Sequence, residues 1–137
     1  MSTRNPVIVG LVTNVMLAVR VKQLATELGF DLRIVPDASA FANELTHENV
    51  ALGIVDINAR PDWQVISAAL ESADLPPILA VGPHMDADGL RAAKAAGVTR
   101  VVSNGTFHRD GASLIDRYVA FPSGDGLNSN AVSDSDR

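Results

Sequence analysis

Five short apolar runs, separated by segments with helical spacing, constrain the fold of this 137-residue chain more than any other feature. The runs cover residues 7–12, 32–35, 50–57, 78–81 and 100–103. Continuous apolar runs of this length, rich in β-branched residues, are typical of strands that are buried on both faces. Apolar residues at helical spacing, together with capping signals, predict helices over residues 15–28, 37–45, 61–70, 86–96 and 109–119.

Residues at the ends of these segments support the boundaries. Asp37 or Ser39 is suited to cap the second helix, and Asp86 or Asp88 is suited to cap the fourth. Gly29 follows the first helix, where a left-handed residue commonly ends a helix. Asn104 and Gly105 are expected to form a turn before the last helix.

Strictly alternating strands and helices predict a parallel sheet with helices on both faces, which is a three-layer α/β sandwich. Five βα units of about 20 to 25 residues favour the flavodoxin-like strand order 2-1-3-4-5. In that order strands 1 and 3 are neighbours, and the carboxyl ends of these two strands flank a crevice. Asp56 lies at the mouth of this crevice and is the main candidate for a functional residue.

Composition narrows the functional classes. The net charge of -5 and the pI near 5.0 argue against a nucleic-acid surface, which needs a positive patch. There is no cysteine, so neither a disulfide framework nor a thiolate metal site is expected. No apolar stretch has the length of a membrane span, and the first residues lack the apolar region of a signal peptide. We therefore expect a cytoplasmic protein that binds neither nucleic acid nor a membrane.

Four segments at the ends of predicted elements stand out: Glu27-Leu28-Gly29-Phe30, Ile54-Val55-Asp56-Ile57-Asn58, Leu75-Pro76-Pro77-Ile78-Leu79 and Ala95-Ala96-Gly97-Val98-Thr99. Together they resemble the receiver domain of bacterial response regulators. The resemblance runs from about Pro6 to Val119 and rests on the order and spacing of these segments. It implies a receiver-like domain over residues 1–120 and makes Asp56 the equivalent of the family's phosphoacceptor.

In the family, an acidic pair after the first strand helps to hold Mg²⁺, which favours oxygen ligands. The corresponding positions here are Val12 and Thr13, and neither carries a negative charge. Asp56 and the carbonyl of Asn58 would make a poor Mg²⁺ site without them. The resemblance therefore implies that Mg²⁺ binding is weak or absent, and we expect no cofactor.

Four further positions depart from the family pattern. Gly82 replaces the Ser or Thr whose hydroxyl follows the phosphoryl group, and Asn104 replaces the Lys that pairs with its charge. Gly105 stands at the position of a proline, and Val101 at that of an aromatic switch residue. The small residues could alternatively open a ligand pocket above Asp56.

These departures favour an atypical receiver, or pseudo-receiver, that is not an enzyme and acts through phosphorylation-independent protein contacts. Two alternatives remain open: phosphorylation of Asp56 in an altered pocket, and small-ligand binding in a flavodoxin-like crevice. Asp56 could also have a purely structural role, accepting backbone N–H groups at a strand end. Whether a sensor kinase acts on the chain stays open.

By analogy with the family, a protein partner or a second copy would bind the face formed by the fourth helix, fifth strand and fifth helix. The candidate residues are Leu90, Arg91, Lys94, Arg100, Arg109, Asp116 and Arg117. Residues 121–137 are rich in Ser, Asp, Asn and Gly, and their composition predicts a disordered tail or linker.

Overall fold

A computed structural model describes residues 5–119 of the chain. The predicted tail over residues 121–137 lies outside the described residues. In chain order the strands and helices are β1 (Val7–Leu11), α1 (Val15–Leu28), β2 (Asp31–Ile34), α2 (Ala38–Glu44), β3 (Val50–Asp56), the short 3₁₀ helix η1 (Ile57–Ala59), α3 (Trp63–Ser72), β4 (Ile78–Gly82), α4 (Ala87–Ala96), β5 (Arg100–Ser103) and α5 (Asn104–Tyr118).

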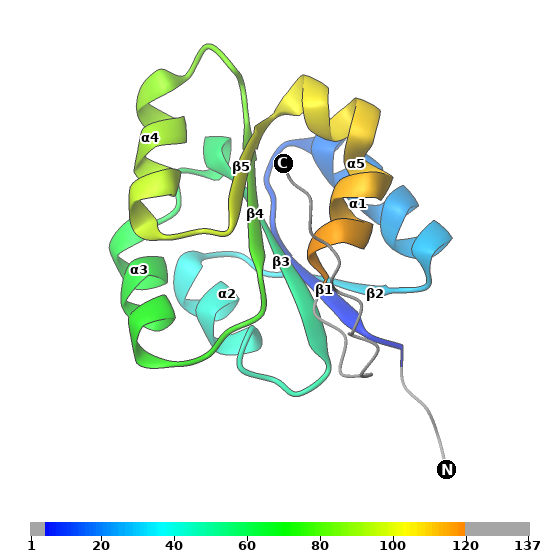
Figure 1. Ribbon diagram of the computed structural model, residues 1–137, viewed down its shortest axis with the longest axis horizontal. Coiled ribbons are helices and arrows are strands. Elements are labelled where there is room, and N and C mark those ends of the chain that lie inside the picture. The colour runs from blue at the N-terminus through cyan, green and yellow to red at the C-terminus, as the bar shows by residue number, and fades with distance from the viewer. Residues whose placement is uncertain (1–4, 120–137) are drawn as a thin grey trace.

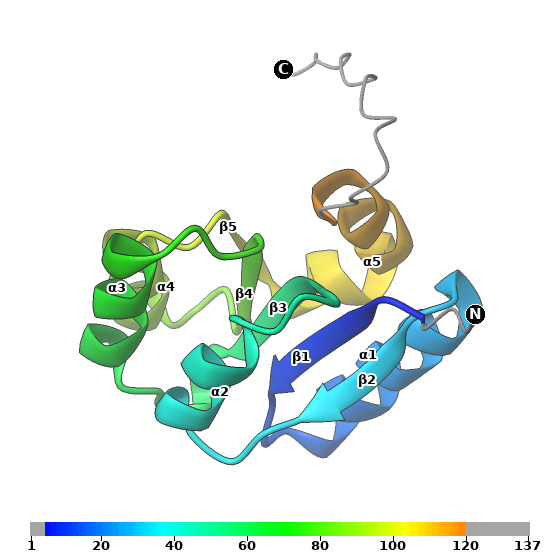
Figure 2. The same ribbon diagram turned by 90° about the horizontal axis from the view of Figure 1, so that it is seen from below.

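The strands form one five-stranded parallel sheet in the order β2-β1-β3-β4-β5. Helices α1 and α5 cover one face, and α2, α3 and α4 cover the other (Figure 1; Figure 2). The predicted three-layer sandwich with flavodoxin-like order is therefore confirmed. Strands β1 and β3 are neighbours, so their carboxyl ends flank the expected crevice.

The core is aliphatic and lies on both faces of the sheet. Every residue of β1, β3 and β4 is buried, which explains why these strands read as continuous apolar runs. Ile8, Leu52 and Leu79 pack toward α1 and α5. On the other face Val9 and Val55 pack with Phe41 of α2.

The helix ends follow the capping chemistry in the sequence. The side chain of Asp37 accepts a hydrogen bond from the amide of Ala40, and that of Asp86 accepts one from Gly89. Gly29 and Gly97 end α1 and α4 at φ of 85° and 99°, a region that glycine adopts without a steric penalty.

The prediction for the last helix was wrong at its start. Helix α5 begins at Asn104 rather than near Arg109, so Asn104 and Gly105 do not form a separate turn. The reason is the cap: the side chain of Ser103 accepts a hydrogen bond from the amide of Thr106 at 3.1 Å. The helix has a local kink, because Asp110 departs from helical geometry.

Candidate functional site

Asp56 is the last residue of β3 and lies at the carboxyl edge of the sheet. Its side chain is only 1% exposed, and it is the one buried charged residue among residues 5–119. The strand register sets Asp56 beside Val81 of β4, while the preceding Val55 pairs with Leu11 of β1. A carboxylate in such a place is costly unless hydrogen bonds replace its water shell.

Those hydrogen bonds are present. One carboxylate oxygen of Asp56 accepts from the amides of Thr13 and Asn14 at 3.1 and 3.0 Å, with the Thr13 hydroxyl at 3.4 Å. The other oxygen accepts from the amide of Asn58 at 2.9 Å. Both oxygens therefore already have protein donors, and three of the four donors belong to the loop that leads into α1.

This arrangement joins three parts of the fold. Asn14 is the N-cap of α1, and its side chain accepts from the amide of Leu17 at 3.0 Å. The backbone N–H of Asn14 donates a hydrogen bond to Asp56, so the negative charge of Asp56 lies at the positive end of the α1 helix dipole. Asp56 also caps η1 through Asn58. The carboxylate thus holds the β1–α1 loop against the end of β3.

The space beside Gly82 is filled by Ile57. A Cβ atom at Gly82 would lie 2.8 Å from Cβ and 3.0 Å from Cδ1 of Ile57, closer than side chains tolerate. Ile57 is only 4% exposed and packs with Ala80 and Ala93. The alternative of a ligand pocket above Asp56 therefore gains no support at Gly82, because Ile57, the residue after Asp56, occupies the space there.

The residues at the family's metal position do not fit Mg²⁺. The side chain of Val12 is buried in the core beneath α1 and α5, and Thr13 offers only a hydroxyl. Asp56 is the single carboxylate in the arrangement, and both of its oxygens face hydrogen-bond donors. Across residues 5–119, no three His, Asp or Glu side chains gather closely enough to hold a metal ion.

The other predicted positions are spread along the sheet edge. Asn104 and Gly105 form the first turn of α5, two strands away from Asp56 in the sheet. A Cβ atom at Gly105 would meet nothing within 4 Å. Val101 lies in β5 and packs against the cluster that contains Ile57. Asp56 is therefore hydrogen-bonded to Thr13, Asn14 and Asn58. Among the described residues, Gly82, Val101, Asn104 and Gly105 donate no hydrogen bond to it.

The candidate contact face divides into two parts. Leu90, Arg91 and Lys94 of α4 line a groove together with Arg100 of β5. Arg109, Asp116 and Arg117 are exposed on α5. Several of the charges already have intramolecular partners: Arg91 is paired with Asp88, Arg109 with Asp110, and Arg100 donates to the Tyr118 hydroxyl.

The arginines around Tyr118 change its acidity. Burial alone would raise the pKa of the Tyr118 phenol, but hydrogen bonds and positive charge from Arg100 and Arg117 outweigh it. The net effect lowers the pKa of Tyr118 below its ordinary value. The guanidinium of Arg117 also lies 6.0 Å from the centre of the Tyr118 ring, at the outer limit of a cation–π contact.

Sequence reasoning missed two features of the site. The first is the set of donors to Asp56, of which Asn14 could have been found as a capping residue immediately before a predicted helix. The second is Ile57, whose role depends on a close approach of β4 and α4 that no local pattern indicates.

Comparisons with known proteins agree with this fold. No protein-family model matches the sequence, and no curated protein matches it either. Solved structures do match. The receiver domain of the TMAO respiratory system response regulator TorR aligns with a TM-score of 0.67 at 17% identity, over 82% of this chain and 94% of that one.

Two further structures, both from Pseudomonas species, give the same result. The signal receiver domain of an HD domain-containing protein from Pseudomonas fluorescens has a TM-score of 0.70 at 16% identity, covering 86% of this chain and 89% of that chain. The receiver domain of a sensor histidine kinase from Pseudomonas aeruginosa has a TM-score of 0.68 at 12% identity, covering 83% of this chain and 97% of that chain. That domain holds a magnesium ion in its active-site cleft. This chain therefore has the fold of response regulator receiver domains.

Proposed function

We propose that this chain is an atypical receiver domain, a non-enzymatic cytoplasmic signalling module that works through protein contacts without phosphorylation of Asp56. The fold, which is that of response regulator receiver domains, supports a role in two-component signalling. The atypical mechanism is our inference from the residues around Asp56.

The observation that carries this proposal is the hydrogen bonding of the Asp56 carboxylate. A phosphoacceptor must present one oxygen to the incoming phosphorus atom, with a divalent cation to offset the charge. Here both oxygens accept amide hydrogen bonds at 2.9 to 3.1 Å, and the side chain is 1% exposed. Attack by either oxygen would require breaking bonds that hold the β1–α1 loop in place.

The surroundings of Asp56 support the same conclusion. Within residues 5–119 no second carboxylate contacts Asp56, and the position of the family's coupling hydroxyl is Gly82, against which Ile57 is packed. Phosphorylation of Asp56 by the family's mechanism would need a cation site and a coupling hydroxyl, and the residues at those positions supply neither. Asp56 is better suited to a structural role, as a permanent link between β3 and α1.

Signalling would then depend on the surface. We propose that a protein partner, or a second copy, contacts the face formed by α4, β5 and α5. The exposed charges on this face include both signs, since Asp116 lies beside Arg117 and Arg109 beside Asp110. Mixed charge is suited to a specific contact, because it rejects partners with the wrong charge pattern.

Chemical labelling tests the proposal. We would incubate the protein with Mg²⁺ and a small acyl phosphate donor and measure the intact mass, with Asp56→Asn as the control. The proposal predicts that neither protein gains a phosphoryl group. An adduct that forms on the unsubstituted chain and is lost in Asp56→Asn would contradict it and would favour the phosphoacceptor alternative.

A further inference from the structure

Strand β5 is an edge of the sheet, and it lies beside a groove. Its one strand neighbour is β4, which it meets from Arg100 to Ser103. Beyond β5 no further strand follows within residues 5–119, so one side of its backbone lacks a ladder partner. Such an edge can accept an added strand through main-chain hydrogen bonds.

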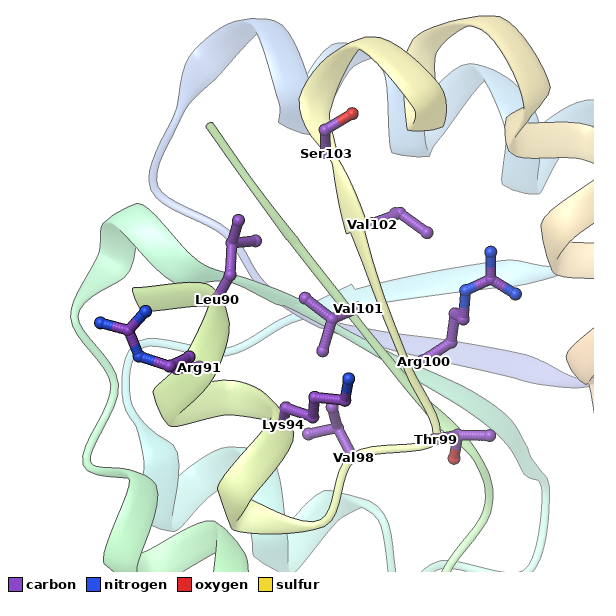
Figure 3. Close-up of a pocket in the computed structure, with 9 residues that line it drawn as sticks. All are labelled: Leu90, Arg91, Lys94, Val98, Thr99, Arg100, Val101, Val102 and Ser103. Carbon is purple, nitrogen blue, oxygen red and sulfur yellow. The ribbon is translucent and has the colours of Figure 1, made fainter. Parts of the chain in front are cut away.

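The groove separates β5 from α4 and has a volume of about 470 Å³. Leu90, Val98 and Val101 give it an apolar floor (Figure 3). Lys94 extends from α4 toward β5, whereas the guanidinium of Arg91 points away from β5 on the outer side of α4 (Figure 3). The complete lining is Leu90, Arg91, Lys94, Val98, Thr99, Arg100, Val101, Val102 and Ser103, which includes three cations and no carboxylate.

The charges of this groove differ from those of the whole protein. The chain carries a net charge of -5, yet cations flank the groove: Arg91 and Lys94 on α4, and Arg100 on β5, whose side chain points toward α5. Arg91 is paired with Asp88, but that pair is highly exposed, so it is weak and easily exchanged. The Lys94 ammonium has no ion-pair partner anywhere in residues 5–119.

The side chains of β5 alternate between the two faces of the sheet. Val101 points toward α4, whereas Arg100 and Val102 point toward α5 (Figure 3). A strand added along β5 would alternate in the same way. Half of its side chains would lie over the apolar floor near Lys94, and the other half would face the guanidinium of Arg100.

We propose that β5 and this groove bind an extended, acidic segment of a partner protein, which adds to the sheet as a sixth strand. Apolar side chains of the segment would fill the groove over Val101, and its carboxylates would pair with Lys94, Arg91 and Arg100. This inference rests on the proposed function and assigns the chemistry of the partner to that contact face.

A second copy of the chain fits this groove less well. Pairing two β5 edges about a two-fold axis would bring two sets of the same three cations together, because both partners present the same surface. Like charges at an interface cost binding free energy. An acidic segment would remove that repulsion and would also neutralise Lys94.

Peptide selection tests this inference. A library of short random peptides would be selected against the full chain and counter-selected against the Arg91→Glu/Lys94→Glu double variant. We expect the selected peptides to be extended and acidic, with an apolar side chain for the groove over Val101 and carboxylates on both faces, for Lys94 on one side and Arg100 on the other. Their affinity should fall on the order of tenfold in Lys94→Glu, because an attraction becomes a repulsion. The matched control is Lys22→Glu, the same charge change on the exposed face of α1, which should leave binding unchanged.

Amide hydrogen exchange would then locate the bound peptide. We expect new protection in β5 and nowhere else in the sheet. Failure to select any peptide, equal binding to Lys94→Glu, or protection confined to another element would overturn the inference. A dimer in solution that Lys94→Glu dissociates would also overturn it, because the occupant would then be a second copy. Phosphorylation of Asp56 would contradict the proposed function separately, whatever the groove binds.

Discussion

The carboxyl end of β3 and the outer edge of β5 are two sites in one sheet with opposite properties. At β3, a buried carboxylate has every oxygen satisfied, and Ile57 fills the neighbouring space. At β5, a groove remains open, cations line it, and Lys94 has no anionic partner among the described residues. Saturated polar groups stabilise a fold, whereas unsatisfied ones are free to bind.

The difference shows why a family position is a poor guide to function by itself. Asp56 occupies the position that resembles the family's phosphoacceptor, but both of its carboxylate oxygens accept backbone hydrogen bonds, from which we propose a structural role. Position 101 is the equivalent of the aromatic switch, and the valine there lines a groove. Each residue has to be interpreted from the atoms that it contacts.

The largest expected effect follows from removing the Asp56 carboxylate. Asp56→Ala would leave the amides of Thr13, Asn14 and Asn58 without an acceptor and should lower the free energy of unfolding by about 2 to 4 kcal/mol. Asp56→Asn should cost less, because its carbonyl oxygen can still accept. Urea unfolding measures both. A neutral or stabilising Asp56→Asn would indicate a strained, charge-repelling pocket instead of a structural link.

A second prediction compares two glycines that both depart from the family pattern. Gly82→Ala should destabilise the protein by about 1 to 3 kcal/mol, because its Cβ would lie 2.8 Å from that of Ile57. Gly105→Ala is the matched control, since its Cβ meets nothing within 4 Å and the position is helical. It should stabilise by about 0.5 to 1 kcal/mol. Thermal unfolding measures both variants. A change in melting temperature of the same sign for Gly82→Ala and Gly105→Ala would contradict the role assigned to Ile57.

At the β5 edge, substitutions should leave stability almost unchanged. The side chain of Lys94 is exposed, so Lys94→Glu should alter the free energy of unfolding by less than about 0.5 kcal/mol. Asp88→Ala should also have a small effect, because its pair with Arg91 is highly exposed. A large loss in Lys94→Glu, measured by urea unfolding, would show that the groove has a structural role as well.

The smallest expected effect concerns Tyr118, the only tyrosine of the chain. Its pKa is lowered, so the folded state releases the phenolic proton more readily than the unfolded state. The ionised Tyr118 phenol therefore stabilises the folded state above the unfolded pKa of about 10. This contribution to stability is lost as the pH falls through the folded pKa. Absorbance titration should give a midpoint below the ordinary value, and Arg100→Leu should raise it. An unchanged midpoint in Arg100→Leu would contradict the assigned cause.

The fold could be predicted from the sequence because its signals are local and repeated. Buried parallel strands read as apolar runs, and Gly29 ends its helix as expected. The start of α5 was predicted wrongly, since Asn104 and Gly105 resembled a turn although Ser103 caps the helix. The partners of Asp56 could not be predicted, because Thr13 and Asn14 are 43 and 42 residues away in the chain.

The central claim is that Asp56 is a structural link and does not accept phosphoryl groups. The most direct test adds Mg²⁺ and a beryllium fluoride phosphoryl mimic and follows the fluorescence of Trp63, the only tryptophan, together with the melting temperature. Trp63 packs against the cluster that contains Ile57, so binding beside Asp56 should change its emission. We predict no saturable change in either signal. A saturable change that is lost in Asp56→Asn would contradict the account.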